Sequence, residues 1–138
     1  MIKKIMLTII SLFLSILILN AKDKIGLASY YANSFEGKLT SNGEIFTNSK
    51  LTCASNFYKI GTKLKVTNLR TNKFVYVRVN DTGMLYGIQL DLSQKAFNTI
   101  GKLSRGIIKV RIEKIEQLNY KLNYKFYVRA RENCSLYK

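Results

Sequence analysis

Residues 75–83 read Val75-Tyr-Val-Arg-Val-Asn-Asp-Thr-Gly83. Valine alternates with larger or charged residues, and this period of two predicts a β-strand with one buried face. The strand runs directly into a carboxylate, Asp81, which a Thr-Gly turn follows. A carboxylate at the end of a rigid strand is held in fixed geometry, as general acid catalysis requires. Because only 8 of the 138 residues are acidic, Asp81 is the leading catalytic candidate. The alternative is an aspartate that caps a turn by accepting backbone hydrogen bonds.

The rest of the chain predicts further short strands and few helices. Alternating patterns predict strands at 25–31, 63–69 and 107–113. Ser93 is placed to cap a short helix that continues through Ile100 and ends at Gly101. Residues 49–55 are interpreted as a possible single helical turn. Several short strands with one or two short helices indicate a compact, mostly β barrel rather than an α/β sheet.

The N-terminus has the pattern of an export signal. A basic start at Lys3 and Lys4 precedes an apolar run from Ile5 to Leu19, and Ala21 offers a small residue for cleavage. The run is shorter than the roughly 20 residues of a membrane-spanning helix, although an uncleaved anchor remains the alternative. We therefore expect a signal peptide at 1–21, a barrel domain at 22–116 and a basic, tyrosine-rich tail at 117–138. The mature protein is expected in the periplasm or cell envelope, with no membrane span after cleavage.

The two cysteines, Cys53 and Cys134, both lie after the expected cleavage point. An oxidising compartment permits a disulfide between them, which would tie the tail to the barrel. In the chain-entropy view, a loop of this length stabilises the fold by about 4 kcal/mol. The alternative is two unrelated buried thiols. A metal site is not expected, since the chain has no histidine.

Charge is the second compositional signal, because the whole chain carries a formal net charge of +15. Removing Lys3 and Lys4 with the signal leaves 21 basic against 8 acidic residues, or +13. Such a field attracts polyanions, and for an exported protein these include anionic envelope polymers and peptidoglycan carboxylates. Sequence signatures of nucleic-acid-binding motifs are missing, so nucleic acid is not an expected partner. A solvated, lysine-rich surface is the simpler alternative.

Taken in order, several short motifs resemble the rare lipoprotein A family, whose members are cell-wall proteins built on a double-psi β-barrel related to expansins. The matching segments run from Gly26 to about Glu113, and each is weak alone but specific in this order and spacing. They are 26–31, 35–37, 40–44 with Phe46, 51–52, 60–62, 66–69, 77–81 with Gly83, and 90–93. The resemblance implies a six-stranded double-psi β-barrel.

The family's activity is lytic cleavage of peptidoglycan glycan strands to 1,6-anhydromuramic ends, with no cofactor. An acid protonates the bridging oxygen, and a hydroxyl of the substrate replaces water as the nucleophile, so one acid that later acts as a base is enough. The resemblance implies that Asp81 and Glu44 are catalytic. It also implies that Asn80, Tyr31, Ser55 and Arg78 line the substrate site. Asp91 matches the family too, but its place before the helix cap indicates a structural role.

Two departures from the family pattern bear on activity. Family members usually carry a histidine at the position of Ser55, and serine cannot exchange a proton near neutral pH as imidazole does. The usual arginine after the catalytic aspartate is Thr82 here, although Arg78 remains near in sequence. Three hypotheses therefore stand: a lytic transglycosylase whose cleft raises the pKa of Asp81, a non-catalytic expansin-like wall-binding protein, and a polyanion-binding protein that uses the tail.

Overall fold

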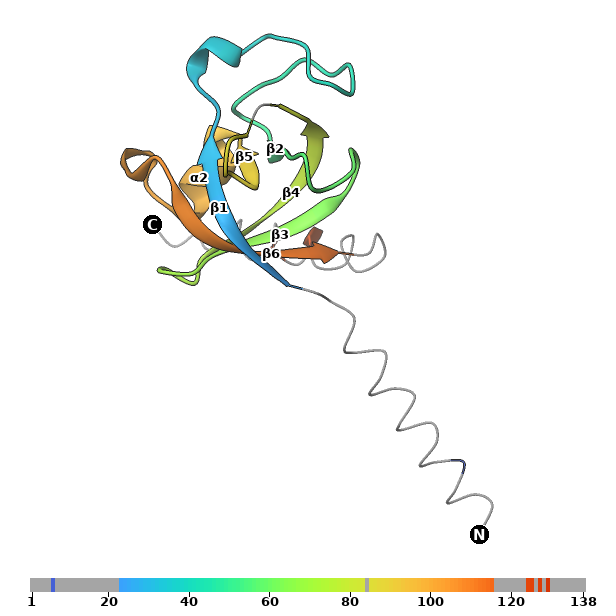
Figure 1. The fold of residues 1–138 in the computed structure, drawn as a ribbon, viewed down its shortest axis with the longest axis vertical. Coiled ribbons are helices and arrows are strands. Elements are labelled where there is room, and N and C mark those ends of the chain that lie inside the picture. The colour runs from blue at the N-terminus through green and yellow to red at the C-terminus, as the bar shows by residue number, and fades with distance from the viewer. Residues whose placement is uncertain are drawn as a thin grey trace.

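Alternating strands close into a six-stranded barrel in the computed structural model, which describes residues 6, 23–83, 85–115, 124, 125, 127 and 129 (Figure 1). The strands are β1 (Lys24–Tyr30), β2 (Thr52–Ala54), β3 (Lys63–Asn68), β4 (Phe74–Asp81), β5 (Leu90–Leu92) and β6 (Ile108–Ile115). The helices are the 3-10 turns η2 (Asn33–Phe35) and η3 (Leu103–Arg105) and the α-helix α2 (Gln94–Ile100). The predicted mostly β, six-stranded barrel is confirmed.

The barrel mixes long antiparallel pairs with short parallel ones. Around the barrel the order is β1-β5-β2-β4-β3-β6, and it closes between β6 and β1. The pairs β3–β4, β3–β6 and β1–β6 are antiparallel, whereas β1–β5 and β2–β4 are parallel. The two three-residue strands β2 and β5 thus lie side by side between β1 and β4. A closed barrel has no free strand edge, so every strand has partners on both sides.

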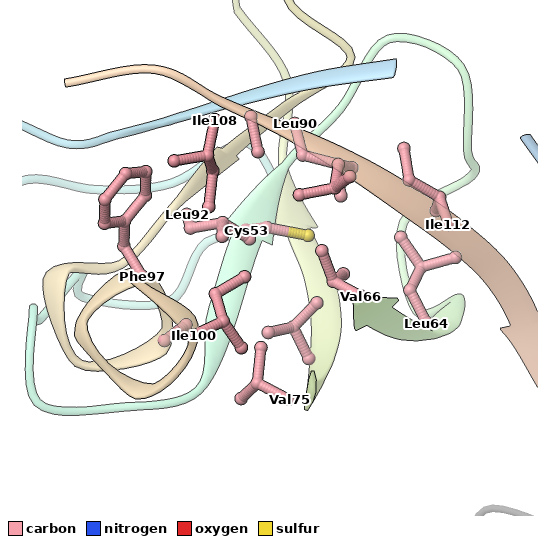
Figure 2. Close-up of a cluster of buried hydrophobic side chains, with 14 of the residues drawn as sticks. Cys53, Leu64, Val66, Val75, Leu90, Leu92, Phe97, Ile100, Ile108 and Ile112 are labelled. Carbon is pink, nitrogen blue, oxygen red and sulfur yellow. The ribbon is translucent and has the colours of Figure 1, made fainter. Parts of the chain in front are cut away.

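The core is formed by the inward face of the long strands together with α2. Val75, Val77 and Val79 of β4 are completely buried, as the alternation predicts. Phe97 and Ile100 of α2 pack against this core, and Figure 2 shows both side chains facing the strand residues. The Ser93 side chain accepts a hydrogen bond from the backbone N–H of Ala96, which confirms it as the helix cap.

The outward face of β4 is also covered. Tyr76 is only 6% exposed. Its ring lies 5.6 Å from the rings of Phe74 and Tyr127, both edge-on to it. Tyr127 belongs to the expected tail, so the C-terminal region contributes at least this ring to the barrel surface.

One expectation on β2 needs correction, and another stays a prediction. Residues 49–55 do not form a helical turn, because Thr52–Ala54 pair with both β4 and β5. Cys53, in the middle of β2, carries a free thiol that is completely buried, and its sulfur points into the core in Figure 2. Cys134, most of the tail and nearly all of the expected signal lie outside the described residues, so the disulfide stays a prediction. Among the described residues, no helix is long and apolar enough to span a bilayer.

Candidate active site

A β-bulge at the end of β4 places Asp81 at the opening of the barrel. Cys53 pairs with Val79 and Ala54 pairs with Asp81, so β4 uses one more residue than β2, namely Asn80. In a regular strand without a bulge, Asp81 would continue the inward series of Val75, Val77 and Val79. The bulge breaks the alternation, and the carboxylate meets the loop 39–45 instead of the core.

Four hydrogen bonds hold the Asp81 carboxylate. Its Oδ1 accepts from the Ser41 backbone N–H at 2.9 Å, the Ser41 hydroxyl at 2.6 Å and the Thr82 backbone N–H at 2.9 Å. Among the described residues, its Oδ2 accepts only from the Tyr31 hydroxyl, at 2.8 Å. Because a carboxylate oxygen offers about two lone pairs, Oδ2 retains a site for a further partner. Asp81 is thus oriented through Oδ1 and available through Oδ2.

These bonds decide the protonation state of Asp81. Partial burial is the largest single influence and raises its pKa, but the bonds from Ser41, Tyr31 and Thr82 together outweigh it. The pKa of Asp81 is therefore lowered, and the carboxyl is ionised at neutral pH. This corrects the expectation that the cleft of the free protein raises this pKa.

Tyr31 orients Asp81 and offers no free ring face for sugar stacking. Its ring is 5% exposed and packs against Phe46 at a centroid distance of 4.3 Å, with Phe35 edge-on at 5.5 Å. Burial and the hydrogen bond to Asp81 raise the pKa of the Tyr31 hydroxyl, so it remains a donor at any physiological pH. These contacts give Tyr31 a positioning role, and the expectation that it binds substrate stays a prediction.

Glu44 lies beside Asp81 but belongs to a separate network. Its Oε2 accepts from Arg78 Nη2 at 2.7 Å and from the Asn80 side-chain amide at 3.3 Å, and its Oε1 accepts from the Asn42 amide at 2.8 Å. The bond from Arg78 is the main reason that the pKa of Glu44 falls to about 2. Glu44 is thus a permanently charged partner of Arg78 and is poorly suited to donate a proton.

The loop 39–45 brings both networks together. A bridge between Leu39 and Ile45 closes the loop, and Gly43 adopts a φ of 83°, which favours glycine. In this loop Ser41 binds Asp81, Glu44 pairs with Arg78, and the Asn42 amide donates to Glu44. The sequence motif 40–44 therefore matters through its hydrogen bonds to the end of β4, and the role of Ser41 was missed because its partner lies 40 residues away.

Two residues expected to bind substrate are instead buried. Ser55 has no exposed surface; its hydroxyl donates to the Gln89 carbonyl at 3.0 Å and accepts from the Phe57 backbone N–H. Asn80 is 2% exposed and holds Glu44. Neither side chain reaches the surface of the opening, so both support the residues that do.

Asp91 is a further carboxyl group close to Asp81. It lies on β5 between Leu90 and Leu92, and its Oδ1 accepts a hydrogen bond from the Ser29 hydroxyl at 2.8 Å. Burial, followed by the negative charge of Asp81, raises the pKa of Asp91, although the Ser29 bond opposes this. The opening thus holds two carboxyl groups whose pKa values are shifted in opposite directions, an arrangement known from acid–base sites.

Comparison with known proteins identifies the family to which the chain belongs. The sequence profile of a family described as "Lytic transglycolase" matches residues 23–112, which is the barrel just described. The chain belongs to this family of RlpA-like double-psi β-barrels. The protein named endolytic peptidoglycan transglycosylase RlpA from Haemophilus influenzae is 44% identical over 91 residues, covering 65% of this chain and 32% of that protein. Its namesake from Pseudomonas aeruginosa is 35% identical, covering 70% of this chain and 28% of that protein.

The lytic transglycolase fold also matches solved structures of other proteins. The Streptomyces papain inhibitor superposes with a TM-score of 0.58 at 19% identity, covering 69% of this chain and 96% of that one. A mutant of the Clavibacter michiganensis expansin in complex with cellohexaose gives 0.56 at 21% identity, covering 68% and 50%. These likenesses support the fold alone. The chain spans about a third of the length of the RlpA relatives, so their activity reaches this protein only as a proposal.

Proposed function

We propose that this protein is a lytic transglycosylase of peptidoglycan, with Asp81 as its catalytic carboxyl group. The observation that carries the proposal is the Asp81 carboxylate at the barrel opening, fixed through Oδ1 and open at Oδ2, in a chain of the lytic transglycolase family. The names of the RlpA relatives support peptidoglycan as the substrate. Export to the cell envelope, which the sequence predicts, would bring the protein to that substrate.

The proposed chemistry needs one proton that moves twice. Protonated Asp81 gives its proton from Oδ2 to the bridging oxygen of the glycan; the C1–O bond breaks, its electron pair goes to that oxygen, and positive charge develops at C1. The carboxylate then takes the proton of the C6 hydroxyl on the same sugar while that oxygen bonds to C1. The product is a 1,6-anhydro ring, and Asp81 is protonated again for the next cycle.

The lowered pKa of Asp81 in the free protein sets a condition on this mechanism. Sugar rings that fill the opening would displace water, and burial is already the strongest influence raising this pKa. Glycan binding is thus proposed to favour the protonated form. Asp91, whose pKa is raised in the free protein, is the second candidate for the first proton donor.

Roles for the other predicted residues follow from their contacts. Tyr31 and Ser41 hold Asp81 in place. The ion pair between Glu44 and Arg78 holds the loop 39–45 against the end of β4. Its two opposite charges lie beside the site in a fixed orientation. The side-chain amide of Asn80 donates a hydrogen bond to Glu44 and helps to hold it in place.

The test is mass spectrometry of glycan strands stripped of their stem peptides and incubated with the purified protein. Asp81→Asn is compared with Asp23→Asn, a carboxylate outside the site whose contact with Arg111 is long, at 3.8 Å. Anhydro-ended fragments from the wild type and Asp23→Asn, and none from Asp81→Asn, are expected. Fragments that persist in Asp81→Asn but disappear in Asp91→Asn would move the acid to Asp91.

A second function, non-catalytic binding of wall glycan, is favoured by two observations. The position of the usual histidine is filled by a buried serine, and Asp81 is ionised in the free protein. This function predicts that the wild type and Asp81→Asn pellet equally with intact sacculi and release no soluble fragments. Fragments with anhydro ends would exclude it.

A further inference from the structure

A hollow on the barrel surface lies away from Asp81 and is lined by cations. Its volume is about 410 Å³, and it lies between the turn that joins β3 to β4 and the segment that joins η3 to β6. Its lining residues are Asn68, Leu69, Arg70, Arg105, Ile107, Ile108 and Lys109. Three of them are cationic and none is acidic, so the hollow concentrates positive charge.

The barrel opening that holds Asp81 and Asp91 is called the acidic opening here. The hollow and the acidic opening are at opposite ends of β4. The β3–β4 turn leads into Phe74, whereas Asp81 is the last residue of this strand. Seven residue steps at about 3.3 Å separate these ends by about 23 Å. Figure 1 shows the turn on the side of the barrel away from the end of β4. A ligand in the hollow would therefore not contact the carboxyl groups of the opening.

The three cations have no carboxylate partner within the part of the chain that the structure describes. The ion pairs there join Lys65 to Glu113, Arg78 to Glu44 and Arg111 to Asp23. None involves Arg70, Arg105 or Lys109, all of which are exposed. Their charges face solvent in a concave surface, where an anion can meet all three.

The backbone beneath these cations is well fixed. Asn68 donates through its side-chain amide to the Ile100 carbonyl at 2.8 Å and accepts from the Arg70 backbone N–H at 2.9 Å. The Leu69 N–H donates to the Lys109 carbonyl, which ties the turn to β6. On the other side, Gly106 adopts a φ of 65° and turns the chain from Arg105 into β6. The three side chains therefore start from positions set by the barrel.

We propose that this hollow is a second binding site, which takes a phosphoryl group of an anionic partner. Two guanidinium groups and one ammonium group can surround a tetrahedral phosphate from several sides, and guanidinium binds phosphate oxygens in pairs. The exposed Ile107 and the half-buried Leu69 beside them offer apolar contact for a carbon backbone next to the phosphate. The site anchors the protein to a phosphate-bearing surface while the acidic opening remains free.

The binding test is an NMR titration of the purified protein with inorganic phosphate at constant ionic strength. Saturable shifts of the backbone amides near Arg70 and Arg105 are expected. The double variant Arg70→Gln/Arg105→Gln should weaken binding about tenfold or more. Lys50→Gln/Lys95→Gln removes the same charge from exposed positions elsewhere and should bind as the wild type does.

Several outcomes would overturn the proposal. One is a linear drift of all basic segments without saturation; another is equal weakening in the two double variants. Acetate at the same ionic strength tests the anion, and binding as tight as that of phosphate would exclude a phosphoryl site. If the double variant failed to fold, Lys109→Gln, at an exposed position of β6, would provide the same comparison through the third cation.

A second measurement separates two sources of the same chemistry. Soluble poly(glycerol phosphate) represents a free polymer, and vesicles of phosphatidylglycerol with phosphatidylcholine represent a lipid surface. Binding to either that is lost in Arg70→Gln/Arg105→Gln supports the site and identifies its source. Binding that this variant leaves unchanged would assign it to general surface charge and overturn the proposal. Neither measurement requires glycan cleavage, so the result is independent of the proposed enzymatic function.

Discussion

The two ends of β4 carry charge in different ways. At the acidic opening each charged group is held: Asp81 accepts four hydrogen bonds, and Glu44 is paired with Arg78 at 2.7 Å. At the other end, Arg70 and Arg105 line a hollow without a carboxylate partner among the described residues. Charges that are fixed before a ligand arrives suit catalysis on one geometry, whereas exposed cations without a carboxylate partner among the described residues suit capture of a phosphate group from solution. The two ends of β4 are therefore expected to be separate in function.

The largest effect is expected from Asp81→Asn. Loss of a general acid and base lowers turnover about 100-fold or more, because the amide that replaces the carboxyl group can neither give this proton nor take it back. Phosphate binding at the basic hollow should be unchanged, since the two regions are at opposite ends of the strand. Product formation is followed by mass spectrometry and phosphate binding by NMR on the same sample. A parallel loss of both would show that the substitution disturbs the whole barrel and that the two ends of β4 are not independent.

Ser41→Ala is expected to shift the pH dependence of activity. Removing the Ser41 hydroxyl takes away a bond to ionised Asp81, so the pKa of Asp81 rises and more of it is protonated at a given pH. The decline of kcat/KM with increasing pH should therefore move to higher pH. Ser104→Ala, an exposed serine near the basic hollow, is the matched control and should leave the profile in place. A downward shift would contradict the role of Asp81 as the first proton donor.

The sequence predicted one part of the molecule much better than the other. The strands β3, β4 and β6 and the helix α2 are long enough to show their period, and Ser93 and Gly101 mark the helix ends, so these elements were predicted within a few residues. β2 and β5 have three residues each, and three residues carry no usable period. Their pairing depends on partners elsewhere in the barrel.

The candidate site shows the same contrast between features that local sequence predicts and features that depend on distant residues. The position of Asp81 at the end of a strand is local information and was predicted. The direction of its pKa was not, because it depends on Ser41 and Tyr31, which lie 40 and 50 residues away in sequence. The same is true of Ser55 and Asn80, whose burial is decided by neighbouring loops and strands. Short-range pattern thus locates the carboxylate, and long-range contact decides its chemistry.

Ser55→Ala separates a supporting role from a catalytic one. The Ser55 hydroxyl is buried and satisfies the Gln89 carbonyl and the Phe57 N–H, so its loss should lower the free energy of unfolding by about 1 to 2 kcal/mol. At temperatures where the variant is folded, the pH profile of activity should match that of the wild type. Urea unfolding and kcat/KM between pH 4 and 8 are the measurements. A changed pH profile would show that Ser55 acts on the proton transfer and does more than support the fold.

Glu44→Gln should have the smallest effect on stability, and one that disappears in acid. The pKa of Glu44 is about 2 in the folded protein, below its ordinary value of 4.5, so ionised Glu44 stabilises the fold. This contribution is complete above pH 4.5 and is lost as the pH falls towards 2. Because the pair with Arg78 is partly exposed, we expect about 1 kcal/mol or less at neutral pH. Thermal unfolding of wild type and variant from pH 7 to 2 should give curves that converge at the acid end. A difference that persists at pH 2 would mean that Glu44 stabilises the loop 39–45 by packing, and that the charge pair is not what holds the acidic opening together.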